Sequence, residues 1–176
     1  FLAALQGRGL HGVRYVVSDD HAGLKEARQA RLAGVPWQRC QFHLAQNALH
    51  YVPSVALRSE VARDLRGVLD AGDRPEADRR LEQLVQKYAA AAPKLATWLE
   101  TNVPESLTVL SLPAAHRRRL RTTNMLERIN KEIKRRTRVA TLFPNEQSAL
   151  RLVTAGLMEI SEDWETNRTY LSMETN

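Results

Sequence analysis

The segment TTNMLERINKEIKRRTR, residues 122–138, places a carboxylate inside a block of positive charge. Residues 116–138 carry ten Lys or Arg against two Asp or Glu, a net charge of +8, whereas the whole chain of 176 residues has a net charge of +6. On a helix, the carboxylate of Glu127 shares its face with three hydrogen-bond donors at steps of three and four residues, namely Asn130, Lys131 and Lys134. An acid and several donors therefore project together.

Two interpretations of Glu127 stay open at this point. The spacing Asn124-x-x-Glu127 resembles a capping box, and Glu127 with Lys131 makes a favourable pair one helical turn apart. Alternatively, Glu127 is one of several acids that meet at a metal site, because a hard divalent cation prefers oxygen ligands.

A second carboxylate stands in a position where sites form. Asp19 directly follows the apolar run VRYVVS, which predicts a strand, and the carboxyl ends of parallel strands are where loops and helix N-termini converge. Asp19 or its neighbour Asp20 could instead cap the next helix. On spacing alone, a helix cap is a stronger explanation than a metal ligand. His21 is suited either to contact a phosphate or to begin that helix.

The positive charge is local. Outside residues 116–138 the chain is slightly acidic, with 16 Lys or Arg against 18 Asp or Glu. Such a block indicates binding to a polyanion, above all nucleic acid, more than a basic surface that serves only solubility. A solvated basic helix face has the same composition and remains the alternative.

Cys40 and His43 have the C-x-x-H spacing of zinc ligands. A structural zinc site needs four protein ligands, however, and Cys40 is the single cysteine of the chain. We expect instead a structural role at the end of the second strand, where the pair would brace Asp19. Among the tryptophans, we expect Trp98 to pack in the core, with stacking on a flipped base as the alternative. Trp37 and Trp164 are likewise expected to pack in the core.

The elements that must position these residues begin with a strand, a helix and a strand. Residues 13–18 and 35–42 are rich in β-branched and aromatic residues, and the helical segment between them is closed by Gly34, which predicts a parallel right-handed unit. The rest of the chain shows helical spacing of apolar residues, interrupted by a connector. Helices are expected over about 43–52, 53–72, 75–92, 95–99, 123–136 and 143–164, with the connector over 102–121.

The last two helices should pack through apolar stripes. In the first of them the inward residues are expected to be Leu126, Ile129 and Ile133. In the second, Asn145 is a plausible N-cap, and the buried stripe should comprise Ala149, Leu152, Val153 and Ile160.

Composition sets limits on the class of protein. The chain is 43% hydrophobic and 26% charged, which fits a globular domain with an ordinary core. No apolar run approaches the roughly 18 residues of a membrane span, so no membrane partner is expected. A single cysteine excludes an internal disulfide, and a reducing cytoplasm is the expected compartment.

Four motifs in order resemble one family. The stretches SDDHAGL, RCQFHLAQN, TTNMLERIN and FPNEQSALRLV are similar to the catalytic region of the Mutator-like transposases of bacterial insertion sequences, and the resemblance runs from about Val16 to Tyr170. It implies an α/β, mostly helical protein with a partial ribonuclease H-like fold that retains two parallel strands. It also implies three acids of the DDE type that hold two divalent metal ions, Mg²⁺ or Mn²⁺.

The resemblance assigns residues to this chemistry. The second acid falls on Asp19 and the third on Glu127, and Cys40 with His43 matches the C-x-x-H motif of the family. The partner implied is DNA, both transposon ends and target, bound by a homo-oligomer near the bacterial nucleoid. The candidate phosphate contacts are the basic residues of the block: Arg117, Arg118, Arg119, Arg121, Lys131, Lys134, Arg135, Arg136 and Arg138.

The resemblance also divides the chain and leaves one acid missing. Residues 1–52 would be a sheet remnant, 53–115 a helical insertion and 116–176 the C-terminal helices with the third acid. The family's first acid precedes Asp19 on an earlier strand, but residues 1–18 contain no Asp or Glu. We therefore expect the chain to be the C-terminal part of a catalytic domain, inactive by itself.

Two other functions remain as alternatives. A non-catalytic DNA-binding remnant of a transposase would keep the basic helix without a complete set of acids. A helical protein-interaction domain, in which the acids only cap helices, predicts neither metal binding nor salt-dependent affinity for DNA.

Overall fold

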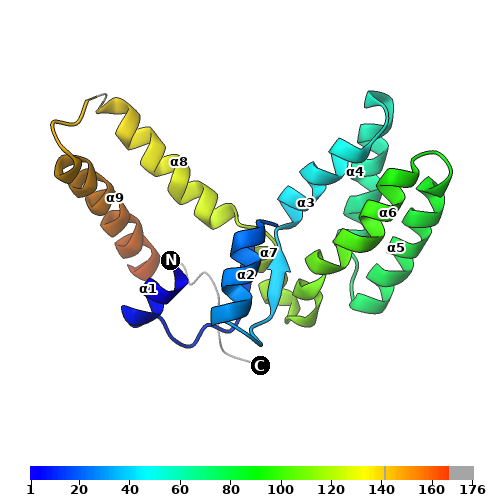
Figure 1. Cartoon of the computed structure of the whole chain (residues 1–176), viewed down its shortest axis with the longest axis horizontal. Coiled ribbons are helices and arrows are strands. Elements are labelled where there is room, and N and C mark those ends of the chain that lie inside the picture. The colour runs from blue at the N-terminus through cyan, green and yellow to red at the C-terminus, as the bar shows by residue number, and fades with distance from the viewer. Residues whose placement is uncertain (141, 167–176) are drawn as a thin grey trace. The chain divides into compact units, whose positions relative to one another are not determined.

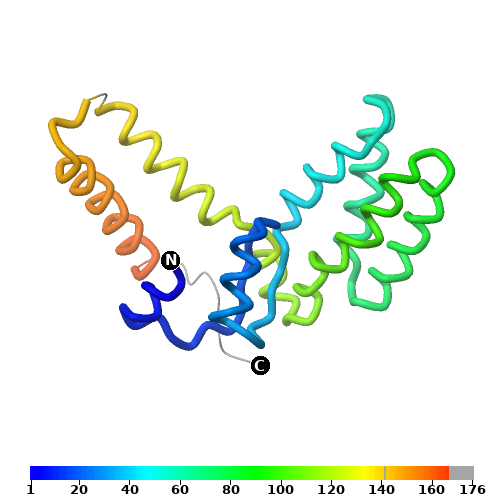
Figure 2. Tube along the Cα trace, in the orientation of Figure 1, coloured from blue at the N-terminus to red at the C-terminus, as the bar shows by residue number. Residues whose placement is uncertain are grey.

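A computed structural model describes residues 1–140 and 142–166 of the chain. These residues are mostly helical and include one small parallel sheet, as expected (Figures 1 and 2). The chain separates into two compact units, residues 1–122 and residues 123–176, with the boundary inside the basic block. Each unit is described by itself.

The sheet of the first unit consists of β1 (Val16–Ser18) and β2 (Trp37–Arg39), which pair in parallel across α2 (Ala22–Arg31). The predicted strand–helix–strand order is confirmed, but both strands are shorter than expected. The ladder begins where the amide of Val16 donates to the carbonyl of Pro36, and β2 ends because α3 starts at Gln41. Gly34, with φ of +80°, provides the turn that leads from α2 to β2.

Helices make up the rest of the first unit and contain its core. Figure 1 shows α4, α5 and α6 packed side by side. Leu44, Leu65, Leu95, Leu99 and Leu107 are at most 1% exposed in this core. The helices are α1 (Leu2–Gly7), α3 (Gln41–Ala48), η1 (Leu49–Tyr51), α4 (Val55–Leu69), α5 (Arg74–Ala89), α6 (Pro93–Asn102), η2 (Val103–Ser106), η3 (Thr108–Ser111) and α7 (Ala114–Leu120).

Two buried polar side chains attach the sheet to this helical core. The amide of Gln38 donates to the carbonyl of Ser106 and accepts from the amide of Val109, each at 2.7 Å. The guanidinium of Arg39, 1% exposed, donates to Asn102 Oδ1 at 2.7 Å and contacts Glu105 Oε2 at 3.2 Å. Because both residues belong to β2, these bonds fix the strand whose end carries the C-x-x-H motif.

The second unit is a helical hairpin of α8 (Asn124–Val139) and α9 (Glu146–Thr166), which run side by side in opposite directions (Figure 1). Asn145 Oδ1 accepts from the amide of Ser148 at 2.9 Å, which confirms the predicted cap of α9. The helices approach closely at buried Gly156, where a Cβ atom would lie 3.2 Å from Cδ of Arg136. Arg136 also pairs with Glu159 on α9 at 2.5 Å.

Two predictions of core packing in this unit were wrong. Leu126 is 57% exposed and Trp164 is 51% exposed, although both were expected to point inward. The predicted stripe of α9, together with Ile129 and Ile133, is partly buried, because a two-helix hairpin covers only one side of each helix.

The other two tryptophans belong to the first unit. Trp98 is partly buried against the hydrophobic core, as expected, and its ring also stacks on Tyr51 with centroids 5.2 Å apart. Trp37 is only partly buried, and its Nε1 donates to Ser18 Oγ at 2.8 Å across the two strands. Of the helices in residues 1–140 and 142–166, none is both long and apolar enough to cross a lipid bilayer.

Candidate functional site

The two neighbouring aspartates after β1 have different surroundings. Asp19 has a side chain that is 54% exposed, and its Oδ1 lies 2.7 Å from Nδ1 of His43. Asp20 instead pairs with Nζ of Lys25 and with Nη1 of Arg39, the latter at 2.9 Å. One carboxylate therefore belongs to a structural ion network, and the other contacts His43.

The ion network explains why Asp20 is poorly suited to hold a metal. Partial burial alone would lower the pKa of Lys25, but its contacts with Asp20 and Glu105 outweigh this effect and raise the pKa. Lys25 therefore stays charged and neutralises Asp20. Among the contacts described, Asp20 forms ion pairs with a lysine and an arginine, whereas Asp19 contacts His43.

The sheet register brings the C-x-x-H motif to Asp19. Ser18 is paired with Arg39, so Asp19 and Cys40 follow at adjacent ends of the two strands, and the amide of Cys40 donates to the carbonyl of Ser18 at 2.8 Å. His43 lies one turn further on, within α3. One ligand atom from each of Asp19, Cys40 and His43 lies within 4.8 Å of the others. The contact expected between this motif and Asp19 is thus present.

Glu127 lies in the first turn of α8. The hydroxyl of Thr123 donates to Glu127 Oε1 at 3.1 Å, and the amide of Glu127 donates to the carbonyl of Thr123. The helix has Thr123 rather than Asn124 as its N-cap, so the capping box suggested by Asn124-x-x-Glu127 is not formed. Sequence reasoning missed Thr123, which the Thr-x-x-x-Glu spacing at a helix start could have indicated.

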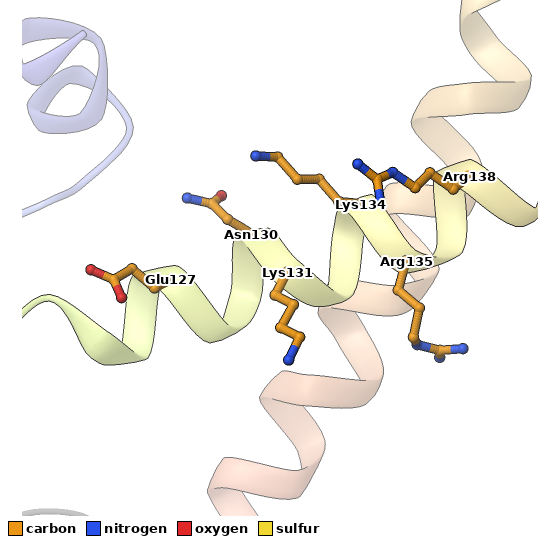
Figure 3. Close-up of a pocket in the computed structure, with 6 residues that line it drawn as sticks. All are labelled: Glu127, Asn130, Lys131, Lys134, Arg135 and Arg138. Carbon is orange, nitrogen blue, oxygen red and sulfur yellow. The ribbon is translucent and has the colours of Figure 1, made fainter.

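The polar face of α8 contains both the acid and several cations. In the view of Figure 3, the side chains of Asn130, Lys134 and Arg138 extend along one edge of this face and those of Lys131 and Arg135 along the other, with Glu127 at the start of the helix. These six residues line one open hollow along α8. Both lysines and Arg138 are exposed, so their charges are available to a ligand in solution.

Among the contacts described, those of the basic candidates Arg117, Arg121 and Arg136 hold the protein together. Arg117 donates to the carbonyls of Leu112 and Gly72, and Arg121 donates to the carbonyl of Leu69 and pairs with Asp70. Arg136 connects α8 to α9, as described above. Of the others, Arg135 is exposed but pairs with Glu132 at 2.7 Å, Arg118 is exposed and Arg119 is partly buried.

The partly buried carboxylate of Glu132 is held charged by two guanidinium groups. Its hydrogen bonds to Arg135 and Arg136 lower its pKa to about 2. Arg136 likewise lowers the pKa of Glu159. Glu132, the second glutamate of the basic block, therefore forms ion pairs within the hairpin, whereas Glu127 lies at the start of the helix.

Asp19 belongs to the first unit and Glu127 to the second. Their convergence at one metal site therefore stays a prediction. What the structure brings together is Asp19 with Cys40 and His43 in the first unit, and Glu127 with the basic face of α8 in the second.

Comparison with known proteins supports the family suggested by the four motifs. The family described as "Transposase, Mutator family" matches residues 1–167. The chain is 55% identical over 98% of its length to the transposase for insertion sequence element IS406 of Burkholderia multivorans. It is 42% identical over 99% to that of ISRM5 of Rhizobium meliloti, and 33% identical over 99% to that of IS256 in transposon Tn4001 of Staphylococcus aureus.

In each case the chain spans less than half of the relative, between 44% and 45% of its length. The match to the family nevertheless extends over almost all of the chain, including both units and both candidate acids. The chain belongs to the Mutator family of transposases.

Proposed function

We propose that this chain supplies two catalytic acids, Asp19 and Glu127, to a DDE transposase that cleaves and joins DNA strands at insertion-sequence ends. The observation that carries the proposal is that Asp19 and Asp20 make different contacts. Only Asp19 lies at the carboxyl end of β1 outside the Lys25–Arg39 ion network. A ribonuclease H-like arrangement of the complete catalytic domain, and a homo-oligomeric active complex, belong to the same proposal.

The donor chemistry of the two acids fits Mg²⁺ or Mn²⁺. Both ions prefer carboxylate oxygens, and Asp19 offers a half-exposed carboxylate directly after β1. A pair of such ions, when bound, would activate an attacking oxygen and stabilise the leaving oxygen of an in-line displacement. The attacking group would be water for cleavage and a 3′-hydroxyl for strand transfer.

The other residues of the chain would position the reactants. His43 would hold Asp19 in one orientation through the 2.7 Å contact, and Thr123 would do the same for Glu127. Lys134 and Arg138, which line the same hollow along α8 as Glu127, would bind DNA phosphates beside the acid (Figure 3). Phosphate contacts of this kind fix the position of the duplex without reading its sequence.

A chimaera tests the proposal. The matching region of the Burkholderia multivorans transposase is replaced by this chain, and nicking and joining of end-containing duplexes are measured with Mg²⁺ or Mn²⁺. The chimaera should be active, and Asp19→Asn or Glu127→Gln should abolish both reactions while leaving DNA binding intact. Glu165→Gln, an exposed glutamate on α9, is the matched control and should keep full activity. An active Asp19→Asn variant would overturn the assignment.

A second candidate, DNA binding without catalysis, is favoured by one observation. The basic face of α8 lies wholly within the second unit, so its affinity for phosphates does not require the acids to assemble. The same assay separates the two functions. A chimaera that binds DNA and never nicks it, while the unaltered relative does, would support this second candidate.

A further inference from the structure

We propose that Asp19, Cys40 and His43 form a binding site for a thiophilic divalent cation, with Zn²⁺ as its representative ligand. This site differs in its ligands from the pair of oxygen-bound ions proposed above, with which it shares only Asp19. All three ligands belong to the first unit, so the inference depends neither on Glu127 nor on how the two units meet.

The structure supplies the ligand that the sequence lacked. C-x-x-H contributes only two donors, too few for zinc, and nothing in its spacing points to Asp19, which lies 21 positions before Cys40. The parallel register places these two residues at neighbouring strand ends and adds a carboxylate to the thiol and the imidazole. Three protein ligands with a water in the fourth position are typical of open, exchangeable zinc sites.

The distances suit a tetrahedral ion after small side-chain adjustments. Zinc bonds of about 2.0–2.3 Å at tetrahedral angles place neighbouring ligand atoms roughly 3.3–3.6 Å apart. The ligand atoms of the three residues already lie within 4.8 Å of one another. His43 Nδ1 is shielded from solvent and lies 2.7 Å from Asp19 Oδ1, so an ion entering between them would replace this contact.

The site combines a rigid interior with an open side. Cys40 is fully buried, and its backbone is held by the hydrogen bond to Ser18 at the end of the ladder. The side chains of His43 and Asp19 are 30% and 54% exposed, which gives an ion and its water access from solvent. One sulfur, one nitrogen and one oxygen donor favour Zn²⁺ or Co²⁺ over Mg²⁺, which requires oxygen ligands.

Occupation of this site would have a consequence for catalysis, and this step alone rests on the proposed function. A carboxylate drawn toward Cys40 and His43 is no longer placed to hold Mg²⁺. Zn²⁺ should therefore inhibit nicking at concentrations far below that of Mg²⁺, and Cys40→Ser should relieve this inhibition.

The direct test is a titration of the chain with Co²⁺, followed by absorption spectroscopy. Because Cys40 is the single cysteine, a thiolate-to-cobalt charge-transfer band in the near ultraviolet reports on this residue alone. We expect saturation at one Co²⁺ per chain, visible bands of low-coordinate cobalt, displacement by Zn²⁺ and no displacement by millimolar Mg²⁺.

Variants identify the other ligands. Cys40→Ser should abolish the charge-transfer band, and Asp19→Asn and His43→Gln should each weaken Co²⁺ binding at least tenfold. His50→Gln, an exposed histidine on η1, is the matched control and should bind Co²⁺ like the unaltered chain. Circular dichroism before titration verifies that each variant is folded.

Three results would overturn the inference: no charge-transfer band in the unaltered chain, a band unaffected by Asp19→Asn and His43→Gln, or one ion shared by two chains. These outcomes are separate from the chimaera assay. Cobalt binding with an inactive chimaera would refute only the proposed transposition, and an active chimaera without a cobalt band would refute only the zinc site.

Discussion

His43 Nδ1 lies 2.7 Å from Asp19 Oδ1, so a histidine on the first turn of α3 contacts the carboxylate that ends β1. Partners that orient a metal-binding carboxylate are typically worth 10- to 100-fold in metal affinity or activity. We expect His43→Ala in the chimaera to raise the Mn²⁺ concentration for half-maximal nicking by about 10-fold or more. His50→Ala should leave the metal dependence unchanged, and an unaltered dependence in His43→Ala would show that the contact is incidental.

The exposed cations beside Glu127 should determine the salt dependence of DNA binding. Replacing Lys134 and Arg138 by Gln removes two candidate phosphate contacts, which should reduce the slope of log affinity against log salt by about 1.8 on duplex DNA. The loss should be equal for specific and random sequences, measured by fluorescence anisotropy over a range of salt.

The matched control for this experiment removes the same charge elsewhere. Arg79 and Lys94 are exposed residues of α5 and α6. The double variant Arg79→Gln/Lys94→Gln should keep the slope of the unaltered chain. An equal change of slope in both double variants would show that net charge, and not the face of α8, governs binding.

Acid should weaken the α8–α9 hairpin progressively as the pH falls from 4.5 to about 2. The pKa of Glu132 is lowered to about 2 in the folded chain by Arg135 and Arg136, from its ordinary value of 4.5. A lowered pKa means that the ion pairs stabilise the fold fully above 4.5, and that this stabilisation is lost as pH falls toward 2. Carbon NMR of the Glu132 carboxyl should show this low titration, and a midpoint near 4.5 would contradict it.

Two helix glycines should respond differently to alanine. Within residues 1–140 and 142–166, no atom lies within 4 Å of a Cβ built on Gly67 in α4, so Gly67→Ala should stabilise the first unit by about 0.5–1 kcal/mol through helix propensity. At Gly156 the same Cβ would press on Arg136, so the gain should be smaller or reversed. Urea unfolding of both variants provides the comparison, and equal gains would mean that Arg136 moves aside without cost.

Removal of the buried guanidinium of Arg39 should destabilise the first unit. Arg39→Met leaves Asn102, Asp20 and Glu105 without their shared donor, and breaking a buried pair on one side costs about 3–5 kcal/mol. Because both carboxylates are about one-third exposed, we expect the lower part of this range or slightly less. Thermal unfolding measures the loss, and a change below about 0.5 kcal/mol would contradict the role of Arg39.

The sequence was informative where local rules decide the structure. The order strand–helix–strand, the long helices and the cap at Asn145 follow from periodicity and capping chemistry, and all were confirmed. The strand lengths were overestimated because apolar residues beyond the ladder still satisfy strand preference. Leu126 and Trp164 were misplaced because periodicity shows which residues share a face and cannot show whether another element covers that face.

The site was predictable only in part. The choice of Asp19 over Asp20 came from resemblance to a family, since spacing treats the two acids alike. Their physical difference depends on Lys25, Arg39 and Glu105, which lie up to 86 positions away and meet only in the folded chain. The contact of Cys40 and His43 with Asp19 was expected, but the grouping of one ligand atom from each of the three residues depends on sheet register, which three-residue strands do not reveal.

The different contacts of Asp19 and Asp20, directly after β1, make the site sensitive to the number of residues that precede them. A single-residue deletion just before Asp19 would shift Asp20 into the position that faces His43 and move Asp19 toward the strand interior. A conservative substitution at either aspartate alters the contacts of that residue alone, whereas such a shift takes both aspartates away from their present partners. The length of the chain between Val16 and Lys25 should therefore tolerate less change than the identity of most residues within it.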